Sequence, residues 1–177
     1  MTVYTGRGDE GRTDLGNAAR VSKANPRIEA CGTVDEVNSL LGTVVPTGHD
    51  DVDDALRTAQ NHLHVVQADL ASPDPDAGGP RVEAAHVETV ESWIDGADEE
   101  LDPLAHFVLP GGSEAGARLH HARSVARRAE RRVVTLAEAE TVDDHVLTYL
   151  NRLSDALFTF ARLVNARDGV DEDAPEY

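Results

Sequence analysis

The sequence has very little lysine, cysteine and aromatic side chain. Lys23 is the single lysine beside fifteen arginines, Cys31 is the single cysteine, and aromatic residues make up 4% of the 177 positions. One cysteine excludes an intrachain disulfide and a cysteine-based metal cluster. Because aromatic residues are so scarce, we expect a core built mainly of Leu, Val and Ala, with Cys31 as a small core residue rather than a nucleophile.

Long apolar runs are also missing. No run approaches the roughly 20 residues that a membrane-spanning helix needs. Arg7, Asp9 and Glu10 interrupt the start of the chain before any signal-peptide pattern forms. We therefore expect a cytoplasmic protein that does not bind membranes.

Positive charge is scarce as well, since the formal net charge is -17. The acidic residues are dispersed along the chain, which argues against nucleic-acid binding. Dispersed acid with almost no lysine indicates a halophilic protein, because high salt screens the self-repulsion. The alternative is a protein from ordinary salt conditions that is simply acidic.

Apolar residues recur at three- and four-residue steps over most of the chain, which predicts amphipathic helices. Pro46 and Gly48 are expected to end the first helix, and Pro73 the second. No strand-like alternation and no internal repeat are evident. The expected helices cover about residues 27–45, 50–72, 82–96, 114–140 and 142–167.

Three segments are expected from this pattern. Residues 1–25 form an irregular glycine-rich segment, residues 26–169 a helical bundle, and residues 170–177 an acidic tail that should fray. Residues 72–80 read as a loop. Five helices with short connections predict an all-α, ferritin-like five-helix bundle.

The glycine-rich start is the first candidate site. Gly6, Gly8 and Gly11 give a Gly-x-Gly-x-x-Gly spacing, and Lys23 follows. Glycines let backbone N–H groups approach phosphate oxygens, and an ammonium adds charge. The pattern does not follow a hydrophobic strand and lacks Gly-Lys-Ser/Thr, so it is neither a Rossmann fingerprint nor a Walker A loop. The alternatives are a polyphosphate cradle and a flexible N-terminus.

An arginine-rich stretch is the second candidate. Arg123, Arg127 and Arg131 recur at four-residue steps on one expected helix. Like charges at this spacing destabilise a helix, so something anionic should compensate. A bound triphosphate would suit the guanidinium geometry. The alternative is intrahelical ion pairing with Glu130 and neighbouring acids on a solvated face.

Polar residues on packing faces are the third candidate. Asp35, Asn38, Asn151 and Asp155 lie on or near faces otherwise suited to packing. Buried polar groups need partners, so an arginine pairing with Asp35 between helices or subunits is one solution. Capping and surface hydrogen bonding are the alternative. The eight histidines show no convincing metal-ligand spacing.

Six sequence blocks, which include the three candidate sites, follow one another in a fixed order along the chain. Together they resemble the PduO-type ATP:cob(I)alamin adenosyltransferases. The resemblance runs from near the N-terminus to about Arg167 and is weak over residues 46–100. The blocks that carry it are Thr5-Gly-x-Gly-Asp-x-Gly-x-Thr13, Arg20-Val-x-Lys23, Arg27-Ile-Glu-Ala-x-Gly-Thr-Val-Asp35-Glu-x-Asn-Ser39, Phe107-x-Leu-Pro-Gly-Gly112, His120-x-Ala-Arg123-x-x-Ala-Arg127-Arg-Ala-Glu-Arg131 and Tyr149-Leu-Asn-Arg-Leu-Ser-Asp155.

The resemblance implies a homotrimer with active sites between adjacent subunits. It implies transfer of the 5′-deoxyadenosyl group of ATP to the cobalt of cob(I)alamin, which yields adenosylcobalamin and triphosphate. Mg²⁺ would bridge phosphate oxygens, with few or no protein ligands. The partners implied are a cob(II)alamin reductase and an adenosylcobalamin-dependent mutase.

The resemblance also assigns roles to residues. Phe107 should lie under the corrin and displace the lower axial ligand, and Asp35 should pair with Arg123 across the subunit interface. Lys23 should neutralise the triphosphate and Arg127 should clamp it. The expected ATP-binding residues are Thr5, Gly6, Arg7, Gly8, Thr13, Asp14, Lys23, Arg127, Arg128, Glu130, Arg131 and Asn151.

Two other classes of function stay open. One is a non-catalytic bundle that binds ATP and corrinoid and senses or delivers adenosylcobalamin. A pure carrier would not need Phe107, Arg123 and Arg127 together, which favours the enzyme. The other is a helical interaction module, which would leave the glycine-rich start and Lys23 unexplained.

Overall fold

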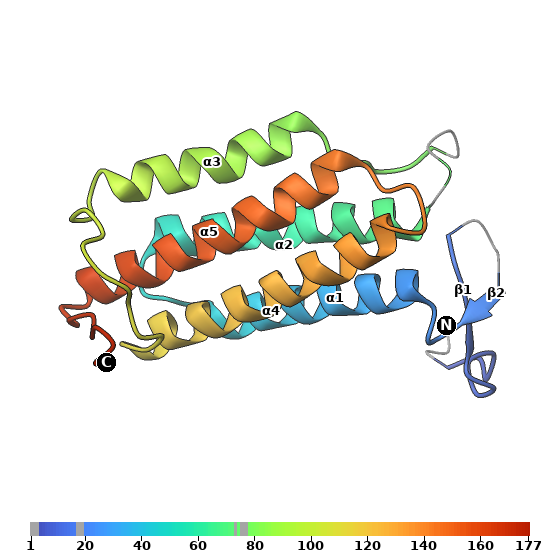
Figure 1. Cartoon of the computed structure of the whole chain (residues 1–177), viewed down its shortest axis with the longest axis horizontal. Coiled ribbons are helices and arrows are strands. Elements are labelled where there is room, and N and C mark those ends of the chain that lie inside the picture. The colour runs from blue at the N-terminus through green and yellow to red at the C-terminus, as the bar shows by residue number, and fades with distance from the viewer. Residues whose placement is uncertain (1–3, 17–19, 73, 75–77) are drawn as a thin grey trace.

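A computed structural model describes residues 4–16, 20–72, 74 and 78–177. In Figure 1 its long helices lie side by side along one axis, and α5 packs against both α4 and α3 while α1 packs against α4 and α2. The expected all-α five-helix bundle is confirmed, with helix ends within a few residues of those predicted. Part of the expected loop at 72–80 lies outside the described residues. The helices are α1 (Pro26–Val44), α2 (Asp50–Ala71), α3 (Ala84–Asp98), α4 (Glu114–Ala137) and α5 (Asp144–Arg167).

Capping side chains explain where three of these helices begin. The Asn25 side chain accepts a hydrogen bond from the Arg27 N–H at 2.8 Å, and Pro26 occupies the first turn of α1. Ser113 caps α4 and Asp143 caps α5 in the same way. A side-chain oxygen at this position satisfies an N–H group that has no intrahelical partner.

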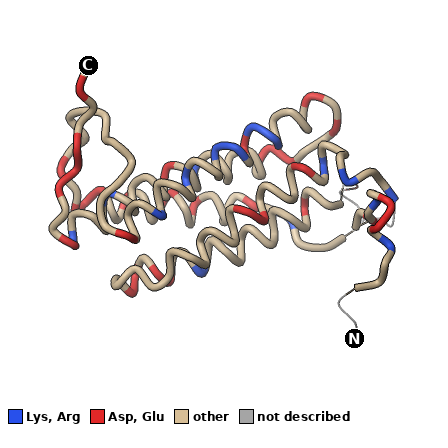
Figure 2. The backbone as a smooth tube through the Cα atoms, turned by 90° about the horizontal axis from the view of Figure 1, so that it is seen from below, with Lys and Arg blue, Asp and Glu red and all other residues tan. Residues whose placement is uncertain are grey.

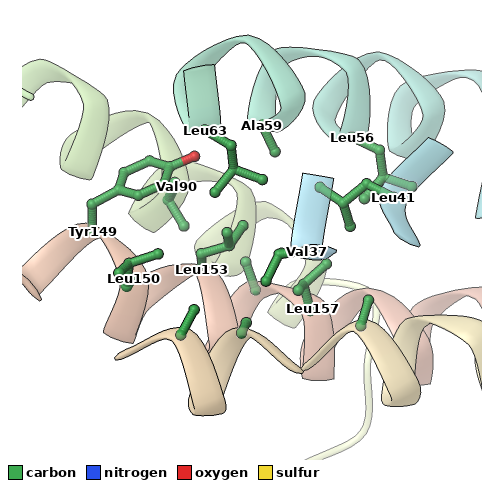
Figure 3. Close-up of a cluster of buried hydrophobic side chains, with 14 of the residues drawn as sticks. Val37, Leu41, Leu56, Ala59, Leu63, Val90, Tyr149, Leu150, Leu153 and Leu157 are labelled. Atoms are coloured by element: carbon green, nitrogen blue, oxygen red, sulfur yellow. The ribbon is translucent and has the colours of Figure 1, made fainter. Parts of the chain in front are cut away.

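Leu, Val and Ala side chains fill the centre of the bundle, as expected from the composition. In Figure 3, Leu56 and Leu63 of α2 face Leu153 and Leu157 of α5 across the core. Each fully buried leucine contributes about 1.5–3 kcal/mol of transfer free energy. Cys31 is packed against the core, and burial raises the pKa of its thiol. The core therefore fixes the frame on which the candidate site residues lie.

A short β-hairpin precedes the bundle, and we did not expect it. Strands β1 (Arg12–Asp14) and β2 (Arg20–Ser22) pair antiparallel, with Thr13 opposite Val21. The N–H of Gly16 also donates to the carbonyl of Ala71 at the end of α2, at 3.2 Å. Strands of three residues are too short to show an alternating pattern, so the sequence indicated only an irregular segment.

The tail after α5 lies against the bundle, so the expectation that it would fray was wrong. The N–H of Leu109 donates to the carbonyl of Asp173 at 2.8 Å. Arg162 of α5 pairs with Glu172 at 3.0 Å, and both side chains are mostly buried. These bonds hold the tail beside the connector between α3 and α4.

Arg167 joins three helices where α5 ends. Its guanidinium pairs with Asp51 at the start of α2 and with Glu100 just after α3, at 2.8 and 2.6 Å. The hydrogen bonds from Arg167 lower the pKa of both carboxyl groups. None of the described helices has the length and apolar character that would let it cross a membrane.

Candidate functional site

The hairpin brings the glycine-rich loop and Lys23 together. The Lys23 N–H donates to the carbonyl of Gly11 at 2.9 Å, and Gly6 and Gly11 have positive φ angles of 71° and 72°. A methyl group placed at Gly8 would come within 3.1 Å of Lys23 Nζ. The positive φ angles favour glycine at the two turns, whereas at Gly8 the Lys23 ammonium would have to shift slightly to admit a side chain. This arrangement can present backbone N–H groups and one ammonium to an anion.

Arg7 and Asp14 form an ion pair beside this loop. Arg7 Nη2 lies 3.0 and 2.9 Å from the two carboxylate oxygens of Asp14. Arg20 donates to the Arg7 carbonyl at 2.7 Å, and Thr5 accepts a long bond of 3.5 Å from the Arg7 N–H. Thr13 lies in β1. Asp14 thus orients Arg7, and its negative charge makes it a poor direct contact for a phosphate.

The arginine-rich stretch of α4 divides into two sets. Arg128 pairs with Glu36 and Arg132 pairs with Glu29, both on α1, so these two arginines are neutralised from another helix and not by the intrahelical pairing with Glu130 that was the alternative. Over the described residues, Arg127 and Arg131 form no ion pair; the Arg131 side chain donates only to the Arg127 carbonyl, at 3.0 Å. Their charge is available for an anion. Figure 2 shows this concentration of basic residues on a chain that is otherwise strongly acidic.

Arg127 and Arg131 border a hollow of about 390 Å³ on α4. Glu130 also lines it, and Glu130 accepts a hydrogen bond from Asn151 Nδ2 of α5 at 3.0 Å. This bond unites two of the expected ATP-binding residues. Val134 and Thr135 complete the lining. The hollow thus combines two cations, a carboxylate and an apolar wall.

Sequence reasoning missed two residues behind this hollow. Arg152 donates to Asn151 Oδ1 at 2.9 Å and to Glu91 of α3 at 2.8 Å. The chain of bonds fixes the Asn151 amide so that its N–H₂ faces Glu130. Arg152 was visible as the neighbour of Asn151, but Glu91 gave no signal because its link to Arg152 exists only in the folded chain.

Asp35 and Arg123 lie on different helices and do not pair within one chain. Asp35 of α1 accepts a hydrogen bond from Gln67 of α2 at 3.2 Å. The Arg123 guanidinium of α4 lies over the Phe158 ring, 5.3 Å from its centroid, a cation–π geometry. The predicted pairing across a subunit interface stays a prediction.

Phe107 borders an apolar pocket of about 480 Å³ between the α3–α4 connector and the tail. Its side chain is 77% exposed, and Tyr177 of the tail is fully exposed. Leu104 and Pro175 also line the pocket. Tyr177 was missed because the tail was expected to fray, although an aromatic residue is conspicuous in a chain with so few. Exposed aromatic side chains around an open pocket indicate a surface that binds an apolar ligand.

His120 lies buried near Arg123 and is 2% exposed. Neither ring nitrogen has a hydrogen-bond partner among the described residues. Burial lowers the pKa of His120, the charge of Arg123 lowers it further, and Glu172 of the tail opposes this shift. The imidazole is therefore held in its neutral form.

The glycine-rich loop and the Phe107 pocket lie at opposite ends of the bundle. Figure 1 shows the hairpin where α1 begins and α4 ends, whereas the α3–α4 connector and the C-terminus lie at the other end. At a rise of about 1.5 Å per residue, Arg131 is roughly 25 Å along α4 from Glu114.

The described residues include no group of three or more His, Cys, Asp or Glu side chains that could hold a metal ion.

Comparison with known proteins identifies the family. Residues 3–164 match the family model described as cobalamin adenosyltransferase. The chain belongs to this family. It is 42% identical over 166 residues to the corrinoid adenosyltransferase PduO of Salmonella typhimurium, covering 92% of this chain but 49% of that protein. It is 41% identical to the corrinoid adenosyltransferase of Bacillus subtilis, covering 96% of this chain and 90% of that one.

Solved structures of the family share the fold. The chain superposes with a TM-score of 0.92 on a phenylalanine-to-alanine variant of the PduO-type ATP:corrinoid adenosyltransferase from Lactobacillus reuteri, complexed with cobalamin and ATP. The identity is 31%, and the match covers 99% of this chain and 100% of that one. An arginine-to-lysine variant of the same enzyme, complexed with ATP, gives a TM-score of 0.91 at 31% identity. The match covers all of that solved chain, whereas this chain spans about half of the length of the Salmonella protein.

Proposed function

We propose that the protein transfers the 5′-deoxyadenosyl group of ATP to the cobalt of cob(I)alamin. The observation that carries this proposal is the pairing of two distinct surfaces within one member of the adenosyltransferase family. One surface offers glycine N–H groups, Lys23 and two arginines, Arg127 and Arg131, that form no ion pair with the residues the structure describes. The other is the apolar pocket at Phe107. The first suits a polyphosphate and the second suits the face of a large ring.

The chemistry needs no protein nucleophile. The electron pair on cob(I) attacks C5′ of ATP, a cobalt–carbon bond forms, and the C5′–oxygen bond breaks with its electron pair leaving on triphosphate. The protein must hold C5′ in line with cobalt and stabilise the departing negative charge. Cys31 is packed against the core, so it has no part in this reaction.

The ATP side is built from the hairpin and α4. Lys23 and the N–H groups near Gly8 neutralise the triphosphate, while Arg127 and Arg131 supply charge-assisted hydrogen bonds. Glu130 and Asn151, joined at 3.0 Å, hold the ribose or adenine end. Two of the expected ATP-binding residues, Asp14 and Arg128, are already engaged in ion pairs and act by positioning their partners rather than by touching ATP.

Mg²⁺ accompanies ATP in this proposal. Mg²⁺ keeps several waters and binds readily to phosphate oxygens, so this proposal requires no cluster of protein carboxylates. When bound, it would neutralise charge on the leaving triphosphate.

The corrin side is built on Phe107. Its largely exposed ring projects at the apolar pocket, where it can take the place of the lower axial ligand of cobalamin. The resulting four-coordinate cob(II)alamin is easier to reduce to the cob(I) nucleophile. Arg123, held over Phe158, would pair with Asp35 of a neighbouring copy and shape this side of the site.

The separation of the two surfaces supports a site shared between copies of the chain. C5′ and cobalt must approach within about 3–3.5 Å, yet the two surfaces of one chain are roughly 20 Å or more apart. A homotrimer with each site between adjacent subunits brings them together. Head-to-tail contacts of this kind close into rings.

Subunit mixing tests the shared site. Phe107→Ala and Arg127→Ala variants, each expected to be nearly inactive when assayed from cob(II)alamin with a reduced flavin, are dissociated together and reassembled. If one subunit supplies Phe107 and its neighbour Arg127, about one quarter of the sites regain both residues and activity returns. Reassembled trimers that stay as inactive as either parent would contradict the shared site.

The cellular location, the salt conditions and the partner proteins are proposed from the composition and the family resemblance. We infer a cytoplasmic enzyme of a salt-adapted cell, served by a cob(II)alamin reductase and delivering adenosylcobalamin to a mutase. The dispersed surface acid supports the salt adaptation.

A direct assay tests the activity. Purified protein is mixed with ATP, Mg²⁺ and chemically reduced cob(I)alamin in high-salt buffer, and the loss of cob(I) absorbance is followed. Light-sensitive adenosylcobalamin and stoichiometric triphosphate are the expected products. Tight binding of both ligands without turnover would instead identify a sensor or carrier.

A further inference from the structure

Asn165, near the end of α5, binds the backbone of the connector that carries Phe107. The residue is 2% exposed. Its Oδ1 accepts a hydrogen bond from the Ser113 N–H at 2.9 Å, and its Nδ2 donates to the Gly111 carbonyl at 3.1 Å. Both ends of one amide are therefore used to hold a single turn.

Two glycines make room for this amide. Gly112 has a φ of 103°, a conformation that favours glycine. A methyl group at Gly112 or at Gly116, in the first turn of α4, would overlap the Asn165 amide. Ser113 lies between them and caps α4 through the Gly116 N–H. The turn and the asparagine are thus fitted to each other.

The main chain of Asn165 also bonds to the start of the tail. The Asn165 carbonyl accepts a hydrogen bond from the Val170 N–H at 2.9 Å, where the chain leaves α5. Three residues later the Asp173 carbonyl bonds to Leu109. The connector and the tail line the Phe107 pocket. The connector is therefore bonded to the Asn165 side chain, and the tail begins at a bond to the Asn165 main-chain carbonyl.

Phe107 itself has few restraints of its own. Its ring is largely exposed, and the bond recorded for its backbone joins its carbonyl to the neighbouring His106 ring at 2.9 Å. The position of Phe107 is consequently determined by the turn at Gly111–Ser113 rather than by packing around its ring.

We propose that Asn165 is the positioning residue for Phe107 in the reaction with cob(II)alamin. Its side chain acts through the Gly111–Ser113 turn, and it touches neither corrin nor ATP. This inference rests on the proposed function. Small displacements of a reacting or orienting group can cost about 100-fold in rate, so loss of the two bonds should be visible in the step that depends on Phe107.

The test compares Asn165→Ala and Asn165→Asp with Asn38→Ala. The Asp variant keeps the side-chain volume and the oxygen that accepts from the Ser113 N–H, but it loses the N–H₂ group that donates to the Gly111 carbonyl. It therefore tests the inference if the Ala variant folds poorly. Asn38 is a matched control, because it is also buried and its Nδ2 donates to a backbone carbonyl, that of Gln60 at 3.3 Å. It joins α1 to α2, away from the connector.

The first readout is the rate from cob(II)alamin with a reduced flavin divided by the rate from pre-reduced cob(I)alamin. Both Asn165 variants should lower this ratio by about tenfold or more and reduce the electron paramagnetic resonance signal of four-coordinate cob(II)alamin. The dissociation constant for ATP should stay within about twofold of wild type, and Asn38→Ala should keep the wild-type ratio. A ratio unchanged in the Asn165 variants, or lowered equally in Asn38→Ala, would overturn the inference.

The second readout does not depend on activity. Amide hydrogen exchange at residues 107–109 and 111–113 should accelerate in both Asn165 variants and stay at the wild-type rate in Asn38→Ala. If the wild-type protein makes no adenosylcobalamin, the proposed function fails, whereas the exchange data still decide whether Asn165 holds the connector. Unchanged exchange in these segments would refute that structural role.

Discussion

Arg132 of α4 pairs with Glu29 of α1, with Nε and Oε1 3.3 Å apart, whereas Arg127 lies on the same helix without an ion pair over the described residues. This difference predicts opposite outcomes for two similar substitutions. Arg127→Ala removes a charge-assisted phosphate contact worth a few kcal/mol in the transition state. We expect kcat/KM for ATP to fall by about 100-fold or more, measured with cob(I)alamin at saturation.

Arg132→Ala is the matched control for Arg127→Ala. An exposed ion pair contributes about 0–1 kcal/mol to stability, so this variant should fold normally and keep kcat/KM within a few-fold of wild type. Equal losses in both variants would mean that the whole arginine face acts by charge alone and that Arg127 has no special contact.

Phe107→Ala should separate two routes to product. The ring is exposed at the pocket and makes no contribution to the core, so the variant should fold and bind ATP as the wild type does. The rate from cob(II)alamin with a reduced flavin should fall far more than the rate from pre-reduced cob(I)alamin. Parallel time courses from the two starting states measure this, and equal losses would exclude the role in displacing the lower ligand.

His120 should make stability depend on pH. Burial and Arg123 lower its pKa in the folded protein below the ordinary value of 6.5, while the unfolded chain keeps that value. Below pH 6.5 the unfolded state binds the proton more readily, so the free energy of unfolding should fall with pH until the folded pKa is reached. Above pH 6.5 His120 should contribute no slope.

Urea unfolding at constant salt, at several pH values from 5 to 8, measures this slope. His120→Leu should flatten it, although His62 has a pKa that burial lowers too and should leave part of it. His64→Gln, on the exposed face of α2, is the control and should keep the wild-type slope. A slope that persists unchanged in His120→Leu would assign the pH dependence to other groups.

Salt should stabilise the fold. The net charge of -17 creates repulsion that ions screen, and this should outweigh the loss of exposed pairs such as Arg167 with Glu100. Between about 0.1 and 2 M KCl, we expect Tm to rise by at least about 5 °C in calorimetry. A flat or falling Tm would contradict salt adaptation.

A variant that lacks three surface carboxylates tests whether repulsion between negative charges causes the salt effect. Asp95, Asp98 and Glu99 are exposed near the end of α3, where negative charge opposes the helix dipole. Changing them to Asn, Asn and Gln should raise Tm at low salt and reduce the gain from KCl. If the salt response is unchanged, the repulsion must arise elsewhere on the surface.

The helices could be predicted because their signals are local. Apolar spacing and breakers such as Pro46 depend on residues within a turn of each other. The hairpin could not be predicted, because three-residue strands carry too few side chains to show a period. The docked tail could not either, since the Arg162–Glu172 pair and the Leu109–Asp173 bond join segments whose proximity only the fold creates.

Part of the candidate site could be predicted from the sequence, and part of it could not. Lys23 beside the glycines and Asn151 beside Glu130 were predicted as members of one site from the order of their motifs, and the fold places each pair together. What the sequence left open was which arginines are neutralised. Glu36 decides that for Arg128 from another helix, so Arg127 and Arg128 were both expected to bind ATP and only the fold separates them.

The single lysine gives the protein a built-in attachment point. Lys23 is exposed and its Nζ lies beside the glycine loop, and the chain has no other lysine side chain. An amine-selective dye or affinity label would therefore react at this position and at the N-terminal amine alone. Occupancy of the nucleotide loop could then be followed on the unaltered protein, with no engineered cysteine and no substitution.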